Sequence, residues 1–223
     1  MKTAASIFLV LVFSVFSAEA KTKHHGRKHK SKKAVPAVNK TTHNTRFSAV
    51  VLDAGHGGHD AGGIPQNLLR EKDVALDVVL RLNRALQKAG FKTILTRSDD
   101  TFIPLGTRVA IANAHPEAIF VSVHYDASPR REACGIGTHF ASAGEAPLAA
   151  FIQRRLMTTT DGTNRGIKNA RFCVLRNTKD RAVLVECGFL TNPHDAALAQ
   201  RAAYRQKQAE QICAGIVEYR NSL

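Results

Sequence analysis

The chain has 223 residues, of which 44% are hydrophobic, and it carries a formal net charge of +14. This length allows one domain with a proper core and leaves little room for a second. After residue 20 no segment is long and apolar enough to cross a bilayer, so we expect no transmembrane anchor.

The first twenty residues have the pattern of an export signal. Lys2 supplies a positive charge, residues 7–16 form an almost uninterrupted apolar run, and Ala-Glu-Ala at 18–20 matches a cleavage signature. Such a segment is too short for a stable anchor and is removed from the mature protein. We expect a signal peptide at 1–20 that exports the protein to the periplasm or cell envelope, or releases it. The alternative is a retained membrane or amphipathic helix.

A basic tail follows at 21–46. Its first part, residues 21–33, holds seven Lys or Arg and no acid, which is half of the net charge. A run of this kind repels itself and has no apolar residue to bury, so we expect it to be disordered. It is either a solubilising spacer or an electrostatic contact with an anionic envelope polymer or membrane surface. Nucleic acid would suit the charge, but export argues against that partner.

From Phe47 onward, apolar runs alternate with amphipathic segments. Strands are predicted at 49–52, 92–95, 118–123, 137–141 and 182–185. Helices are predicted at 74–86, 105–114 and 147–157, and from the Asn192-Pro193 pair to about residue 219 with room for a break. Residues 172–175 fit a short strand or a loop. Together these elements predict a single α/β domain over 47–223, with a mostly parallel twisted sheet flanked by helices on both faces.

Titratable residues follow three of the predicted strands. The first strand runs into Asp53 and His56, the third into His124 and the last into Glu186, while Glu71 stands at a helix start. In an open α/β sheet the binding crevice lies outside the carboxyl ends of the strands. We therefore expect these side chains to meet at one edge of the sheet.

Two histidines and a carboxylate with an open fourth position are the ligands of a catalytic zinc site. An unligated carboxylate beside them can move a proton from water to a leaving amine. This pattern suggests that His56, Glu71 and His124 bind Zn²⁺, with Glu186 as the acid/base and Asp53 as an acceptor for an imidazole N–H. Ordinary readings stay open: a loop histidine, or an acid placed for the helix dipole.

Five sequence blocks between residue 49 and about residue 198 resemble the zinc-dependent N-acetylmuramoyl-L-alanine amidases, a family of bacterial cell-wall enzymes. They are VVLDAGHGGHDAGG, REKDVALDVVLRLNRAL, ILTRSDDTFIPLGTRVAIANA, IFVSVHYDAS and RGIKNARFCVLRNTKDRAVLVECGFLTNPHDAALA. The resemblance implies zinc ligands at His56, Glu71 and His124 and a catalytic Glu186. It also implies peptidoglycan as substrate, with cleavage of the amide between the lactyl group of N-acetylmuramic acid and L-alanine of the stem peptide.

Some positions depart from the usual pattern of that family. Tyr125-Asp126 replaces a small residue and an asparagine, Cys187 stands where an apolar residue is commoner, and His59 is expected to be a bystander. Residues 127–165 contain one evident helix, so we expect no self-inhibitory helical insertion. Two other functions stay open, a zinc peptidase acting within the stem peptide and an inactive cell-wall-binding homologue. We expect a monomer, and the four cysteines leave disulfides and free thiols equally open.

Overall fold

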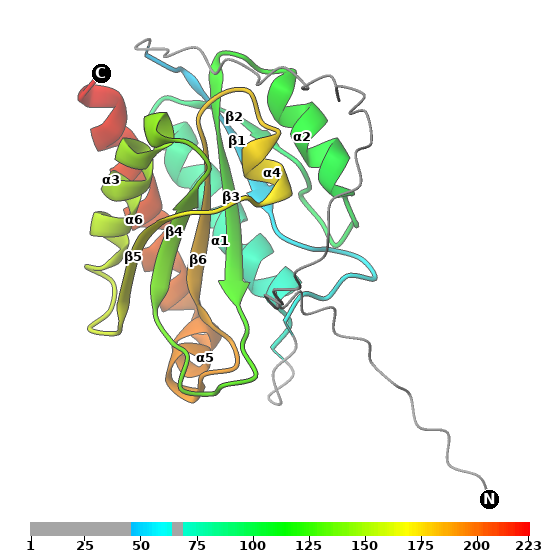
Figure 1. The fold of residues 1–223 in the computed structure, drawn as a ribbon, viewed down its shortest axis with the longest axis vertical. Coiled ribbons are helices and arrows are strands. Elements are labelled where there is room, and N and C mark those ends of the chain that lie inside the picture. The colour runs from blue at the N-terminus through cyan, green and yellow to red at the C-terminus, as the bar shows by residue number, and fades with distance from the viewer. Residues whose placement is uncertain (1–45, 64–68) are drawn as a thin grey trace, which may run out of the picture. The chain divides into compact units, whose positions relative to one another are not determined.

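The computed structural model describes residues 46–63 and 69–223, which form a six-stranded sheet between helices (Figure 1). The strands are β1 Ala49–Ala54, β2 Lys92–Leu95, β3 Ala118–Asp126, β4 Ile136–Phe140, β5 Asn164–Asn169 and β6 Ala182–Phe189. The helices are α1 Glu71–Lys88, α2 Leu105–Asn113, α3 Ala146–Leu156, α4 Cys173–Arg176, α5 Pro193–Gln200 and α6 Ala202–Asn221, with a short 3-10 helix η1 at Ala143–Glu145. The expected signal peptide and nearly all of the expected tail lie outside the described residues.

The strand order is β2-β1-β3-β6-β4-β5. All neighbouring strands run parallel except β4 and β6, which are antiparallel. The prediction of an α/β domain with a mostly parallel sheet is therefore confirmed. Within the described ranges, no helix combines the length and apolar character that a membrane span requires.

Two apolar clusters lie on opposite faces of the sheet. Successive side chains of a strand point to opposite faces, so Val50 and Leu52 of β1 join a cluster with α1, α3 and α6, whereas Val51 joins one with α2 and α4. Figure 1 shows α2 and α4 on the viewer's side of the sheet and α1 behind it. Helices thus cover both faces, as predicted, and the polar strand residues introduced below lie on the face of α2 and α4.

The predicted elements match the observed ones most closely where the apolar pattern is strong. β3 and β6 extend past their predicted ends, so His124 and Glu186 lie inside strands. The prediction of a strand or loop at residues 172–175 is wrong, because Cys173–Arg176 is one helical turn. Strand β5 has no counterpart among the predicted elements, since its NRGIKN sequence is polar and pairs only along one edge. Arg201 separates α5 from α6, which confirms the break, and all four cysteines are free thiols.

Candidate active site

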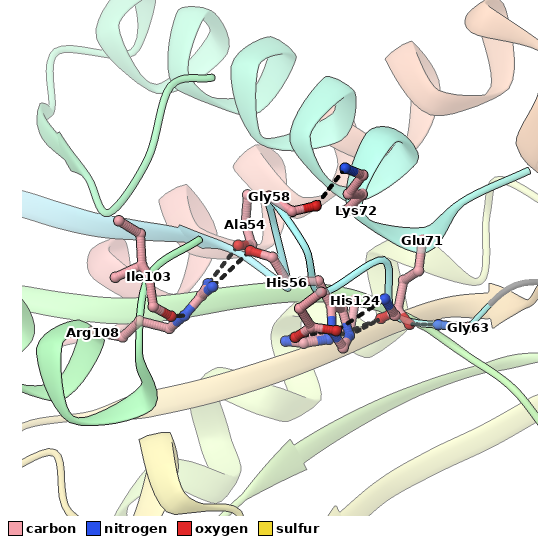
Figure 2. A network of polar contacts seen from close by, with 12 residues as sticks. Ala54, His56, Gly58, Gly63, Glu71, Lys72, Ile103, Arg108 and His124 are labelled. Carbon is pink, nitrogen blue, oxygen red and sulfur yellow. Dashed lines mark hydrogen bonds and ion pairs between the residues drawn. The ribbon is translucent and has the colours of Figure 1, made fainter. Parts of the chain in front are cut away.

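Three of the residues predicted from the sequence meet at the carboxyl end of the central strands (Figure 2). His56 lies in the loop after β1, Glu71 is the first residue of α1, and His124 lies near the end of β3. Glu71 Oε1 is 3.0 Å from His56 Nε2 and 2.9 Å from His124 Nδ1. One potential ligand atom from each residue lies within 4.8 Å of the other two. The structure thus assembles a group of the composition and size that binds a metal ion.

Glu186 lies beside this triad because β6 pairs with β3. The register places Glu186 opposite His124, so both side chains share the face of α2 and α4. Glu186 Oε2 is buried and, within the described residues, has no hydrogen-bond partner. Burial, together with the nearby Asp126 and Glu71 carboxylates, raises the pKa of Glu186 well above its usual range. A buried, unpartnered carboxylate is costly unless it serves a ligand or a reaction.

The charges within the triad are strongly coupled. Burial alone would raise the pKa of Glu71, but hydrogen bonds with His124 and His56 outweigh it and hold that pKa well below its usual range. Burial likewise opposes the charged form of His56, yet Glu71 and Asp60 raise its pKa overall. Glu71 is therefore an ionised carboxylate buried between two imidazoles, a donor set that suits a divalent transition metal.

Two glycines leave the space that the triad occupies. A Cβ at Gly55 would lie 2.3 Å from His124 Cε1, and a Cβ at Gly62 would lie 2.5 Å from Glu71 Oε2. Both distances are far shorter than van der Waals contact, so a side chain at either position would displace a triad residue. The glycine-rich loop therefore allows the close approach of backbone to the site.

The loop that carries His56 is strained and firmly held. His56 has φ of 59°, and it is the one non-glycine residue with positive φ in the described part of the chain. Arg97 donates to the carbonyl oxygens of Ala54 and Gly55, and Arg108 Nη2 donates to that of His56 at 2.7 Å. Figure 2 shows Arg108 reaching toward this loop. Two buried guanidinium groups thus fix three consecutive carbonyl groups.

Asp60, and not Asp53, is the acceptor next to a triad imidazole. Asp60 Oδ2 lies 2.9 Å from His56 Nδ1, which leaves His56 Nε2 facing Glu71. The predicted role of Asp53 is wrong because its side chain is buried on the face under α2. There it accepts hydrogen bonds from Thr96 Oγ1, Ser122 Oγ and Arg108 Nη1, each at 2.7 Å.

The role of Asp60 had one weak signal in the sequence, its spacing four residues after His56. Nothing in the sequence singled out the two buried arginines that hold the loop.

The site opens into a cleft of about 500 Å³. Its rim is apolar: Phe102, Leu105 and Phe172 line it and are 36%, 56% and 42% exposed. Asp126 also lines the cleft, and burial raises its pKa. The His59 ring packs on Phe102, with centroids 4.2 Å apart, and is not part of the triad.

This combination defines a class of protein. A triad of two histidines and one glutamate, with a separate buried glutamate beside it at the carboxyl end of an α/β sheet, is the arrangement of a metal-dependent hydrolase.

Comparison with known proteins narrows the class to a family. Residues 50–218 match the family model described as N-acetylmuramoyl-L-alanine amidase. The chain is 37% identical over 193 residues to the amidase LytC of Bacillus subtilis, a match that covers 82% of this chain and 39% of LytC. It is 31% identical over 217 residues to the amidase AmiA of Escherichia coli, covering 76% of this chain and 75% of AmiA.

A solved structure supports the same assignment. The N-acetylmuramoyl-L-alanine amidase from Clostridium difficile 630 matches with a TM-score of 0.76 and 32% identity, covering 80% of this chain and 99% of that one. The chain belongs to the N-acetylmuramoyl-L-alanine amidase family, whose members are peptidoglycan hydrolases. The resemblance that the sequence blocks carry is thereby confirmed.

Proposed function

We propose that this protein hydrolyses the amide bond between the lactyl group of N-acetylmuramic acid and L-alanine of the peptidoglycan stem peptide. Family membership supports the substrate. The observation that carries the chemistry is Glu186 Oε2, a buried oxygen with no hydrogen-bond partner in the described residues, next to a triad of metal-binding composition. Such an oxygen is available to the reacting water or the leaving group.

The metal in this proposal is zinc, held by His56, Glu71 and His124. Two imidazoles and one carboxylate with a fourth position left for water are the ligands of catalytic zinc. The hydrogen bond between His56 Nδ1 and Asp60 fits, because a ligand histidine commonly gives its other ring nitrogen to a carboxylate. When bound, zinc polarises the scissile carbonyl and lowers the pKa of a coordinated water.

The chain's own residues supply the proton transfers and the positioning. Glu186 takes a proton from the attacking water and returns it to the departing L-alanine nitrogen. A carboxylate whose pKa is raised above its usual range accepts and holds a proton more readily, which suits it to this transfer. Arg97 and Arg108 keep the His56 loop in place, so no loop movement is needed to present this ligand.

The experiment that tests this function is product identification by mass spectrometry on purified peptidoglycan. Intact stem peptides with a free L-alanine amino group, released only without chelator, are the expected products. Shortened peptides that leave the muramoyl–alanine bond intact would assign the protein as a peptidase within the stem, and binding without products would make it an inactive homologue. Zn²⁺, and not Mg²⁺, should restore activity to chelated protein.

The layout of the chain is part of the proposal: a signal peptide at 1–20, a basic tail at 21–46 and a catalytic domain at 47–223. The residue pattern of the first twenty positions and the substrate of the family support export. Deleting residues 21–33 should leave hydrolysis of a small soluble substrate unchanged and weaken binding to whole cell wall in a salt-dependent way. Salt-independent binding would contradict the proposed electrostatic contact.

A further inference from the structure

The face of the sheet that carries Glu186 continues beyond the metal-binding triad, across β4 and β5. Gly137 of β4 pairs with Glu186, and Gly166 of β5 pairs with Gly137. On this face α4 packs on β6, whereas α3 packs on β4 and β5 from the other side. Because glycine has no side chain, Gly137 and Gly166 form a flat floor on this face of the sheet, between Glu186 and the edge strand β5.

A register shift between β4 and β5 places the side chain of Arg165 next to these two glycines. Ile136 pairs with Asn164 but Gly137 pairs with Gly166, so Arg165 has no partner on β4. Irregularities of this kind re-aim a side chain, often beside an active site. The guanidinium carbon of Arg165 lies 4.7 Å from the centroid of the Phe189 ring on β6. A Cβ at Gly137 would lie 3.4 Å from Arg165 Cβ, which places the arginine directly beside the floor.

A second cation and an aromatic wall complete the surface. Lys168 is exposed and pairs with His139 across the β4–β5 ladder. The His139 ring packs edge-on against Phe172, with centroids 5.2 Å apart, and Phe172 lines the catalytic cleft. Burial and the charges of Lys168 and Arg165 lower the pKa of His139, so the imidazole is neutral and the positive charge comes from the two cations.

Both cations act electrostatically on the Asp126 carboxylate of the cleft, but neither forms an ion pair with it. In the part of the chain that the structure describes, ion pairs form elsewhere and none includes Arg165 or Lys168. Arg165 Nη1 has a long hydrogen bond, 3.4 Å, to the carbonyl oxygen of Cys134. Unpaired cations beside a catalytic cleft are suited to hold an anionic part of the substrate.

We propose that the surface formed by Gly137, His139, Arg165, Lys168 and Phe172 binds the stem peptide on the leaving side of the scissile amide, with Arg165 and Lys168 pairing to one of its carboxylates. This inference rests on the proposed function. Adjacent strands are about 4.8 Å apart, so β5 lies roughly 10 Å from the strand of Glu186. An extended peptide covers that distance in about three residues. The carboxylate therefore belongs to the second or third residue of the stem.

The test compares two soluble muramoyl peptides that differ in one group, a carboxylate or a carboxamide on the second or third stem residue. The parent protein should cleave the acid with the higher kcat/KM. Arg165→Gln and Lys168→Gln should lower kcat/KM for the acid by about ten- to a hundredfold, mainly through KM, and leave the amide nearly unchanged. Lys168→Arg keeps the charge and should keep the preference.

Lys207→Gln is the matched control, because it removes an exposed charge from α6 on the opposite side of the sheet. This variant should leave kcat/KM unchanged for both the acid and the amide substrate. Thermal unfolding should show that all variants are folded. Equal losses on acid and amide, or no loss, would overturn the proposal. So would unchanged kinetics with weaker binding to whole cell wall, since the cations would then serve an anionic polymer. A parent protein that releases no stem peptide contradicts the proposed function instead.

Discussion

Arg108 provides a direct test of how the loop that carries His56 is held. Its side chain is 3% exposed and forms an ion pair at 2.7 Å with Asp53, whose side chain is 1% exposed. The same guanidinium donates to the carbonyl oxygens of Ala54, His56 and Ile103 (Figure 2). Arg108→Met keeps most of the apolar bulk and removes both the charge and every donor.

The expected cost follows from the burial of this pair. Removing one partner of a buried ion pair costs about 3–5 kcal/mol, because the other charge remains buried and uncompensated. Asp53 keeps its bonds from Thr96 and Ser122, which places the cost near the lower limit, about 3 kcal/mol. For a domain of this size Tm should then fall by about 6–12 °C. Metal affinity should fall by about ten- to a hundredfold, because His56 loses its support.

Thermal unfolding of the metal-free protein measures the first effect, and chelator competition measures the second. Arg154→Met is the matched control, since its side chain is 65% exposed and pairs with Glu218 at the surface. That change should cost less than about 1 kcal/mol. Asp53→Asn, added to Arg108→Met, should recover part of the lost stability because the buried charge is gone. Equal Tm values for the two arginine variants would refute the reasoning.

Three further results are expected. Glu186→Gln should keep its metal content and lose about 10²–10⁴-fold in kcat; near-normal turnover would contradict its role. Gly55→Ala should lose metal because its Cβ would meet the His124 ring. Gly106→Ala is the control: it has open space and a helical position, and it should raise stability by about 0.5–1 kcal/mol. Similar metal contents in the two variants would be evidence against the close approach of Gly55 to His124. Burial alone would raise the pKa of Asp77, but hydrogen bonds from two arginines lower that pKa overall. The ionised Asp77 therefore stabilises the fold above about pH 4, and this contribution disappears as the pH falls through the lowered pKa. Asp77→Asn should lower Tm at about pH 7, and its Tm difference from the parent should shrink as the pH falls below about 4. A Tm difference that stays constant with pH would argue against this linkage.

Local sequence determined the elements whose pattern depends on few partners. Continuous apolar runs identified the buried strands β1, β3 and β6, since a strand covered on both faces needs apolar side chains on both. Ligand-type residues at or after the ends of these strands and at one helix start, together with the family blocks, pointed to His56, Glu71, His124 and Glu186. Chemical type and position along a strand are local properties, so they can be read from the sequence.

Tertiary structure decided what depends on contacts between distant residues. β5 forms because its backbone pairs with that of β4. Its side chains are polar, so no apolar pattern in the sequence predicts this edge strand. Asp53 bonds with Arg108 instead of a triad imidazole because α2 brings a guanidinium over the sheet, 55 residues further along the chain. The position of Arg165 beside Gly137 likewise follows from the register shift between β4 and β5. Sequence thus specified the chemical groups of the site, whereas packing chose their partners, because a hydrogen bond or ion pair depends on positions that only the folded chain defines.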